Sequence, residues 1–264
     1  MMDAEFQYVS GQGRSDFPGL LAEFQRSSDR EAVRSDALLD RVYGPHERQR
    51  FDFFPTTGPA RATLVYFHAG YWQSRDKASF RFIATPLNDA GFNVALANYP
   101  LCPDVMLKAL VLAAQPAPAA VAALAPGVPM VIAGHSAGGH LAVELGMRGA
   151  NGAAVCGILA ISGVFDLRPL LATSLNANLG LDADEAERMS PVLRVQASPL
   201  PALFAVGGDE TPEFLAQTKQ MTAAWQKAGN QGEELIVEGA HHFSVLEALI
   251  APSNELHRRL AALA

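Results

Sequence analysis

The sequence predicts an α/β fold in which a mostly parallel central sheet is covered by helices on both faces. Three observations support this. Apolar runs of four to seven residues alternate with segments of helical periodicity, a Gly-x-Ser-x-Gly pentapeptide stands between one such run and the next helical segment, and acidic and histidine residues follow two later runs. The 264 residues are long enough for one large domain. We expect residues 1–43 to form an N-terminal helical extension and residues 163–201 to form a small helical cap.

The composition excludes several classes of partner. The chain is 49% hydrophobic and 18% charged, with a formal net charge of −7, which argues against nucleic acid and anionic membranes. The first residues lack the basic and apolar pattern of a signal peptide, and no apolar run is long enough to span a bilayer. Cys102 and Cys156 fit buried thiols in a reducing compartment, so we expect a cytoplasmic protein. The oligomeric state stays open, a homodimer being one option.

The N-terminal part is expected to lie outside the alternating core. Residues 1–15 show no periodicity and are expected to be loose or to lie over the surface. Residues 16–43 have apolar side chains at helical spacing up to Val42, and Gly44 follows. Residues 48–55 alternate polar and aromatic side chains, as an outer antiparallel strand does.

Six core strands and five helical segments follow. The expected strands are Ala62–Phe67, Phe92–Ala97, Met130–Ala133, Val155–Ile161, Ala202–Val206 and Glu234–Val237. The expected helical segments are 76–90, 104–124, 137–149, 212–228 and 242–263. We expect the second of these to be a crossover helix that breaks near Pro116 and Pro118.

The segment Gly134-His-Ser-Ala-Gly138 predicts a nucleophile. Between a strand and a helix, this pattern forms a sharp turn that exposes the serine hydroxyl above the end of the sheet. The backbone N–H of the next residue then points at the group that the serine attacks. We therefore predict that Ser136 is the nucleophile and that Ala137 helps to form an oxyanion hole.

A base and an orienting acid are expected at the carboxyl ends of later strands. Asp209 follows the strand that ends at Val206, and we assign the acid to it, with Glu210 as the adjacent competitor and Glu213 as a more distant one. After the last strand come two histidines. We favour His242 as the base because Phe243 would anchor the turn, and we expect His241 to face solvent or to play a supporting role.

The segment Phe67-His-Ala-Gly-Tyr-Trp72 follows the first core strand, where a loop can donate N–H groups to an oxyanion. We assign the hole to the N–H groups of Gly70 and Ala137, with Tyr71 or Ala69 as a third donor. Other histidines have structural interpretations: His68 would stabilise this loop, His135 would pack in the turn and His140 would be a hydrogen-bonded core residue. No pair of histidines has the spacing of a zinc site, and we expect neither a metal nor a cofactor.

Taken together, these motifs resemble the serine-dependent arylformamidase (kynurenine formamidase) branch of the α/β-hydrolases. The matching segments are His68–Gln73, Gly134–His140, Ser162–Arg168, Gly208–Phe214 and His242–Phe243. The resemblance runs from about residue 43 to the last helix. One departure is Ala69, which stands where the family's oxyanion loop usually has its first glycine. If that position needs a positive φ, alanine there costs on the order of 1 kcal/mol.

The resemblance implies hydrolysis of a small aromatic substrate, either an N-formyl aryl amine such as N-formylkynurenine or a small aryl ester. The side chains of Tyr71, Trp72, Phe165 and Phe243, with Leu170 as a further candidate, could wall a pocket for a flat ring. A charge on the substrate would need a partner, for which the sequence offers Arg168, Arg75 and Glu144. The alternatives are a general carboxylesterase and a hydrolase-fold binding protein without activity.

Overall fold

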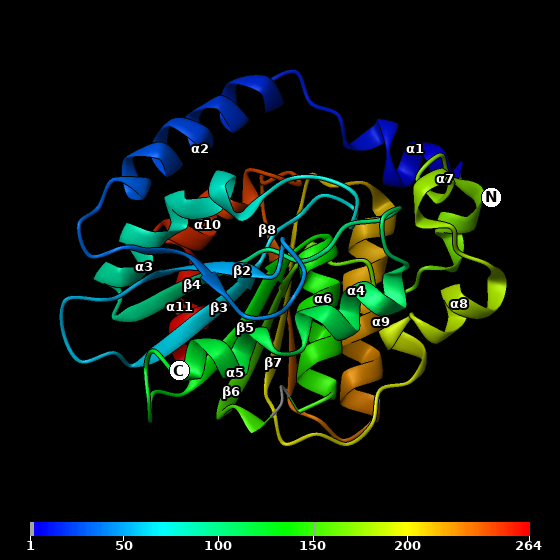
Figure 1. Ribbon diagram of the computed structural model, residues 1–264. Coiled ribbons are helices and arrows are strands. Elements are labelled where there is room, and N and C mark those ends of the chain that lie inside the picture. The colour runs from blue at the N-terminus through cyan, green and yellow to red at the C-terminus, as the bar shows by residue number, and fades with distance from the viewer. Residues whose placement is uncertain (1–2, 150–151) are drawn as a thin grey trace.

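The computed structural model describes residues 3–149 and 152–264 and shows a mixed eight-stranded sheet between two layers of helices (Figure 1). The strands are β1 (Leu38–Val42), β2 (Arg50–Phe54), β3 (Ala62–Phe67), β4 (Phe92–Ala97), β5 (Met130–His135), β6 (Val155–Ile161), β7 (Ala202–Gly207) and β8 (Gly232–Val237). Their order in the sheet is β1-β2-β4-β3-β5-β6-β7-β8. Strand β2 is antiparallel to both of its neighbours, and the remaining pairs are parallel. The predicted fold class and the six predicted core strands are confirmed.

Successive side chains of the central strands enter two separate cores because the side chains of a strand alternate between its faces. Val65 of β3 belongs to the first core and Leu64 to the second. The first core is covered by α4 (Leu107–Ala114), α5 (Ala117–Ala122), α6 (Ala137–Met147) and α9 (Pro212–Lys227). The second is covered by α2 (Phe17–Ala32), η2 (Lys77–Ile83), α3 (Ala84–Asp89), α10 (Val245–Ile250) and α11 (Glu255–Ala262). Burial on both faces explains why these strands are almost continuously apolar.

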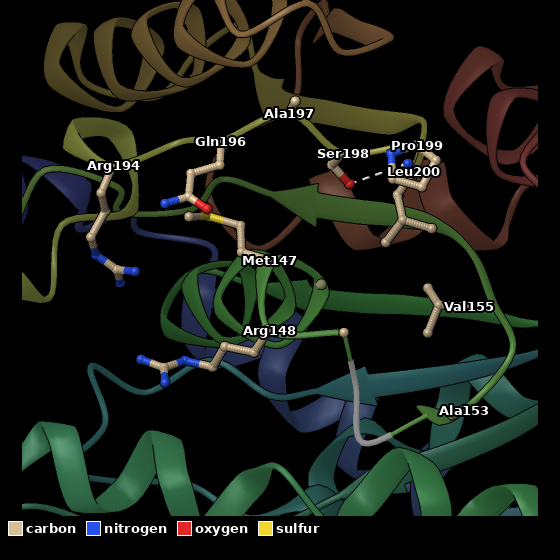
Figure 2. Close-up of a pocket in the computed structure, with 12 residues that line it drawn as sticks. Met147, Arg148, Ala153, Val155, Arg194, Gln196, Ala197, Ser198, Pro199 and Leu200 are labelled. Carbon is tan, nitrogen blue, oxygen red and sulfur yellow. Dashed lines mark hydrogen bonds between the residues drawn. The ribbon is translucent and has the colours of Figure 1, made fainter.

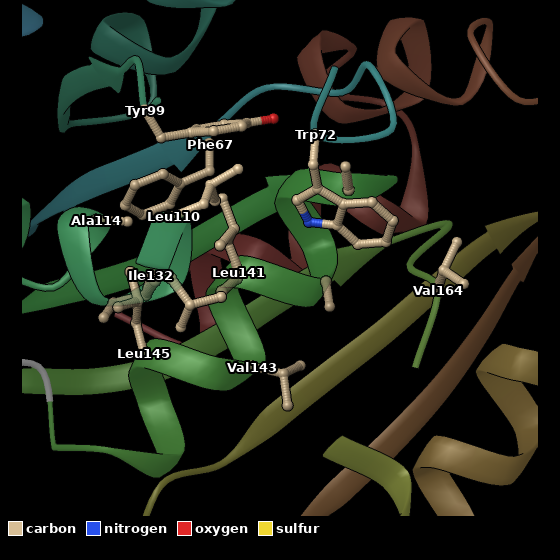
Figure 3. Packing of buried hydrophobic residues seen from close by; sticks show 14 of the residues in the cluster. Phe67, Trp72, Tyr99, Leu110, Ala114, Ile132, Leu141, Val143, Leu145 and Val164 are labelled. Carbon is tan, nitrogen blue, oxygen red and sulfur yellow. The ribbon is translucent and has the colours of Figure 1, made fainter. Parts of the chain in front are cut away.

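Helix α6 is the most enclosed helix of the first core. Every residue from Ala137 to Gly146 is buried, and Figure 3 shows its Leu141 and Leu145 among side chains of the sheet and of the neighbouring helices. Because β5 leads directly into α6, this packing fixes the start of the helix against the end of the sheet. The predicted break in the crossover helix is also confirmed, since α4 ends at Ala114 and α5 begins at Ala117.

Two expectations for the N-terminal part need correction. The helical pattern does not extend to residue 43: α2 ends at Ala32, and residues 38–42 form strand β1. Pairing with β2 outweighs the helical spacing here, and the N–H of Asp40 is held by the Asp52 carboxylate at 2.8 Å. As a result β2 is not the outermost strand, because β1 lies outside it.

The first described residues lie over the surface of the fold, which is one of the two expectations for residues 1–15. Met1 and Met2 lie outside the described residues. Helix α1 (Ala4–Tyr8) and the short turn η1 (Ser10–Gln12) bury Gln7, Tyr8 and Gln12. In Figure 1 this blue segment and α2 arch over one end of the sheet.

Residues 163–201 contain only short helical turns: η4 (Arg168–Ala172), α7 (Asn176–Leu179), α8 (Ala183–Arg188) and η5 (Pro191–Leu193). They follow β6 and pack beside α1 and α9, with the Glu5 carboxylate accepting hydrogen bonds from Ser174. In the described ranges, no helix has both the length and the apolar character needed to cross a membrane.

Candidate active site

The turn between β5 and α6 holds Ser136 in a strained conformation. Its φ is 57° and its ψ is −119°, a region that side-chain-bearing residues rarely adopt. A Cβ atom at Gly134 would lie 2.0 Å from the carbonyl oxygen of Gly138, and one at Gly138 would lie 1.9 Å from that of Phe67. Only glycine fits at both positions, so the sequence Gly-x-Ser-x-Gly is what allows the strand, the serine and the helix to meet this closely.

The same turn leaves hydrogen-bonding groups available. Ala137 is the first residue of α6, where a backbone N–H has no acceptor within the helix. Ser136 is 1% exposed, and its hydroxyl makes no hydrogen bond to any residue in the described ranges. Both groups are therefore free to act on a bound molecule.

The carboxylate that meets His242 belongs to Glu210. Oε2 of Glu210 lies 2.6 Å from Nδ1 of His242, and both side chains are buried. Asp209 is exposed, and its backbone carbonyl accepts a hydrogen bond from Arg14 at 2.6 Å. The prediction that Asp209 orients the histidine is thus wrong, and the neighbour named as its competitor takes that position.

Further hydrogen bonds to Glu210 explain this arrangement. The Ser162 hydroxyl donates to Oε1 at 2.5 Å, and the Gly207 backbone N–H donates to the same oxygen at 2.9 Å. Ser162 itself has a positive φ of 49° at the end of β6. The glutamate side chain is longer than that of aspartate and folds back over the end of β7 to reach these donors. Their hydrogen bonds offset the free-energy cost of burying the carboxylate.

His242 and His241 point to different surroundings. The ring of His242 is 4.7 Å from the rings of both His135 and Phe214, which places it beside the elbow. His241 turns to the N-terminal segment, where its Nε2 lies 3.1 Å from a carboxylate oxygen of Asp16. Nε2 of His242 makes no hydrogen bond within the described residues, so it is available for proton transfer.

The loop after β3 adopts a tight left-handed turn. Gly70 has a φ of 127°, and the next two residues, Tyr71 and Trp72, also have positive φ, at 49° and 59°. The Gly70 carbonyl accepts hydrogen bonds from the N–H groups of Gln73 and Ser74. The N–H groups of Gly70 and Tyr71 donate to no acceptor in the described chain. Because Gly138 touches the end of β3, the loop that carries these two donors begins next to the elbow.

Ala69 does not carry the strain considered for it. It is absent from the residues of positive φ in the described ranges, so alanine replaces glycine there without backbone cost. Within residues 3–149 and 152–264, five of the six non-glycine residues with positive φ belong to the three segments of this site: Tyr71, Trp72, Arg75, Ser136 and Ser162. Strain of this kind gathers at functional sites.

The histidines expected to be structural are fully buried. His68 stacks on Tyr99 with ring centroids 4.5 Å apart, and burial lowers its pKa to about 4. Burial also lowers the pKa of His135 well below its usual value, with the charge of His242 as the second cause. Nε2–H of His140 donates a hydrogen bond to the Met189 carbonyl at 2.8 Å. The rings of His68 and His135 are therefore neutral at pH 7.

The predicted aromatic wall is only partly assembled at the site. Phe243 packs against His135 and His242, and Tyr71 reaches the N-terminal segment through a hydrogen bond from its hydroxyl to the Tyr8 carbonyl. Phe165 is fully buried against Phe204 at a ring separation of 5.8 Å, which corrects its expected place in the pocket wall.

The other two candidates point toward the first core. Trp72 is fully buried beside α6 (Figure 3). Its ring is edge-on to that of His140 at 5.1 Å, and Leu170 belongs to the same core.

The N-terminal segment covers this edge of the sheet, a contribution that the sequence did not reveal. The Thr211 hydroxyl donates to the Gln7 carbonyl at 2.7 Å and accepts from Nε2 of Gln12 at 2.8 Å. Farther along, Phe17 meets Phe243 edge-on at 5.2 Å. Helix α1 has only five residues, which is too short for its periodicity to be recognised.

A cavity of about 510 Å³ lies at the opposite edge of the sheet (Figure 2). Met147 and Arg148 at the end of α6 line it, together with Val155 at the start of β6 and Ser198 before β7. It is therefore separate from the site around Ser136. Residues 3–149 and 152–264 contain no group of three or more potential ligands placed to hold a metal ion.

Comparison with known proteins shows that the chain is similar to hydrolases. No protein-family model matches the chain. It is 27% identical to a kynurenine formamidase of Danio rerio over 242 residues, covering 87% of this chain and 83% of the relative. A kynurenine formamidase of Salmo salar is 28% identical over 241 residues, covering 86% and 81%.

Two solved structures extend the comparison. A structure from Silicibacter sp., provisionally described as a thioesterase, superposes with a TM-score of 0.86 at 32% identity, covering all of this chain and 99% of the other. An esterase from Pyrobaculum calidifontis superposes with a TM-score of 0.70 at 18% identity, covering 95% and 92%.

Proposed function

The chain belongs to the α/β-hydrolase superfamily and hydrolyses amide or ester bonds, and on this premise we propose that it removes the N-formyl group from an aryl amine by means of Ser136, His242 and Glu210. The observation that carries the proposal is the strained serine at the start of α6, beside a histidine whose Nδ1 is held by a buried carboxylate. The similarity to two kynurenine formamidases supports the formamide as substrate.

The first half of the proposed reaction forms a formyl-enzyme. Nε2 of His242 takes the proton of the Ser136 hydroxyl, whose oxygen attacks the formyl carbonyl carbon. The carbonyl oxygen becomes an oxyanion that accepts hydrogen bonds from the N–H groups of Gly70 and Ala137, with Tyr71 as the third donor. Glu210 stabilises the imidazolium. The C–N bond then breaks, and the aryl amine leaves with the proton from His242.

The second half regenerates the enzyme. A water molecule gives a proton to His242 and attacks the formyl ester, and the ester bond to Ser136 breaks as the proton returns to the serine oxygen. Formate and the free aryl amine are the products. No step in this sequence calls for a group from outside the chain other than water.

A thioester or carboxylic ester is the second candidate substrate. It is favoured by the similarity to the structure provisionally described as a thioesterase, which covers nearly the whole of both chains. The same three side chains would perform the reaction, with an alcohol or thiol as the leaving group. We expect kcat/KM for N-formylkynurenine to exceed that for p-nitrophenyl acetate by at least about tenfold, and the opposite order would favour the ester.

The role of Ser136 is tested with Ser136→Ala, whose turnover of both substrates should fall at least roughly 10³-fold while the protein stays folded. Ser198→Ala is the matched control because Ser198 lines the distant cavity of Figure 2. A fluorophosphonate should label the wild type and not Ser136→Ala. If Ser136→Ala keeps more than a tenth of the wild-type rate on both substrates, Ser136 is not the nucleophile. If the wild type hydrolyses neither substrate, the protein is an inactive binding protein.

A further inference from the structure

Arg75 differs from the other partly buried cations of the chain. Its guanidinium makes neither a hydrogen bond nor an ion pair within residues 3–149 and 152–264. Every other lysine or arginine that is not exposed donates to a carboxylate or a carbonyl: Arg14, Arg34, Arg48, Arg50, Lys77, Arg81 and Arg194. Withdrawing a charge from water without a counter-charge is unfavourable, and the same burial lowers the pKa of Arg75.

The position of Arg75 connects it with the active site. It follows directly on the loop that carries Gly70 and Tyr71, and its guanidinium carbon lies 4.7 Å from the centre of the Phe243 ring. Phe243 is the residue after His242, and its ring is 5.5 Å from that of His135. The charge of Arg75 also contributes to the low pKa of His135. The cation thus stands beside the histidine loop, against the ring of Phe243.

The backbone holds Arg75 in this place at a conformational cost. Its φ is 73°, a left-handed conformation that is unfavourable for a residue with a side chain. Its carbonyl oxygen accepts a hydrogen bond from Nη2 of Arg48 at 2.8 Å, which fixes the peptide from behind. A strained backbone and an unpaired cation at one residue are both explained if the side chain meets a ligand.

The other charged candidates already have partners. Arg168 is bound by both oxygens of Asp166, at 2.9 and 2.6 Å, and lies in solvent at the cap. Glu144 is fully buried and paired with Arg148 and Arg194, two helical turns beyond Ser136. Neither is available for a charge on the substrate.

We propose that Arg75 binds a carboxylate of the substrate and so makes the enzyme selective for N-formyl aryl amines that carry a carboxylate over those that do not. This inference rests on the proposed function and names the substrate class within it. The planar guanidinium offers several donors to a carboxylate, and Phe243 beneath it keeps the group oriented. Arg75 is therefore a specificity-determining residue and takes no part in proton transfer.

The test compares two substrates that differ in one charge: N-formylkynurenine and its carboxamide, in which a neutral amide replaces the carboxylate. We define the selectivity as kcat/KM for the acid divided by kcat/KM for the carboxamide. Arg75→Gln should lower the selectivity by on the order of 10–100-fold, mainly through KM of the acid, because a charge-assisted contact is lost. Arg75→Lys should recover part of it.

Arg61→Gln is the matched control. Arg61 also stands over an aromatic ring, that of Phe92 at 5.9 Å, but at the amino-terminal edge of the sheet, away from Ser136. Its substitution should leave the selectivity unchanged. If Arg75→Gln affects both substrates equally, Arg75 only shapes the loop and the inference is overturned.

An independent measurement separates this inference from the proposed function. If the wild type hydrolyses only p-nitrophenyl acetate and no formamide, the proposed function fails, yet the anion site can still be measured with kynurenine as a competitive inhibitor of ester hydrolysis. Kynurenine should inhibit the wild type at least tenfold more strongly than Arg75→Gln. Equal inhibition of the two proteins would show that Arg75 holds no carboxylate.

Discussion

Nδ1 of His242 lies 2.6 Å from Oε2 of Glu210, whereas Asp209, the residue before it, is exposed at the surface. The turn after β7 therefore sends two adjacent acidic side chains in opposite directions. The inward one is supported by the Ser162 hydroxyl and by the Gly207 N–H. A carboxylate held in this way can fix the tautomer of the imidazole and stabilise its protonated form during catalysis.

This relationship predicts different effects for two conservative substitutions. Glu210→Gln should lower kcat by about 10³–10⁴-fold, because an amide neither stabilises the imidazolium nor favours the required tautomer. Asp209→Asn should change kcat by less than about threefold, since the Asp209 side chain lies in solvent. The measurement is steady-state kinetics on N-formylkynurenine and on p-nitrophenyl acetate, with circular dichroism to verify folding. The opposite ranking of the two variants would restore Asp209 as the acid.

Much of the fold could be predicted because the central strands are buried on both faces and are therefore apolar throughout. The elbow was also visible in the sequence, since the close approach at Gly134 and Gly138 leaves no room for a Cβ atom. Strand β1 was missed because two of its three apolar residues, Leu38 and Val42, are exposed at 41% and 61%, and only Leu39 packs against the core. Its pairing with β2 depends on contacts that sequence spacing does not encode.

Whether Asp209 or Glu210 orients His242 could not be predicted from the sequence. Asp209 and Glu210 both follow the end of β7, and only the positions of the donors Ser162 and Gly207 decide which carboxylate turns inward. The position of the N-terminal segment over this edge of the sheet was missed for a different reason. Its contacts, such as Gln12 with Thr211, join residues about 200 positions apart in the chain and leave no periodic pattern.

The buried neutral histidines predict how stability depends on pH. The pKa of His68 falls from its ordinary value of 6.5 to about 4 on folding, so between these values the unfolded chain binds a proton that the folded chain does not. The free energy of unfolding must therefore decrease as the pH falls from 6.5 toward 4 and be constant, for this group, above 6.5. At about 1.4 kcal/mol per pH unit, the loss from His68 by pH 4 is about 3 kcal/mol.

The histidine is isolated by comparing the wild type with His68→Gln in urea unfolding experiments between pH 7 and pH 4. Carboxylates and the other histidines titrate in both proteins and cancel in the difference. The stability advantage of the wild type should shrink by about 3 kcal/mol over this range. An advantage that stays constant would mean that His68 has the same pKa in the folded and the unfolded protein.

The contacts of residues 3–15 predict that removing one hydroxyl, that of Thr211, opens this N-terminal segment locally. Thr211 both donates to the Gln7 carbonyl and accepts from Gln12, so Thr211→Val removes these two hydrogen bonds while keeping the shape of the side chain. Losing these bonds should favour local opening of residues 3–15 and raise the rate of tryptic cleavage after Arg14 by about tenfold or more. Thr222→Val is the control, because Thr222 lies in α9, the helix that begins directly after Thr211, and donates only to the Thr218 carbonyl. The cleavage products are followed by mass spectrometry, and equal rates for the two variants would show that Thr211 does not hold this segment in place.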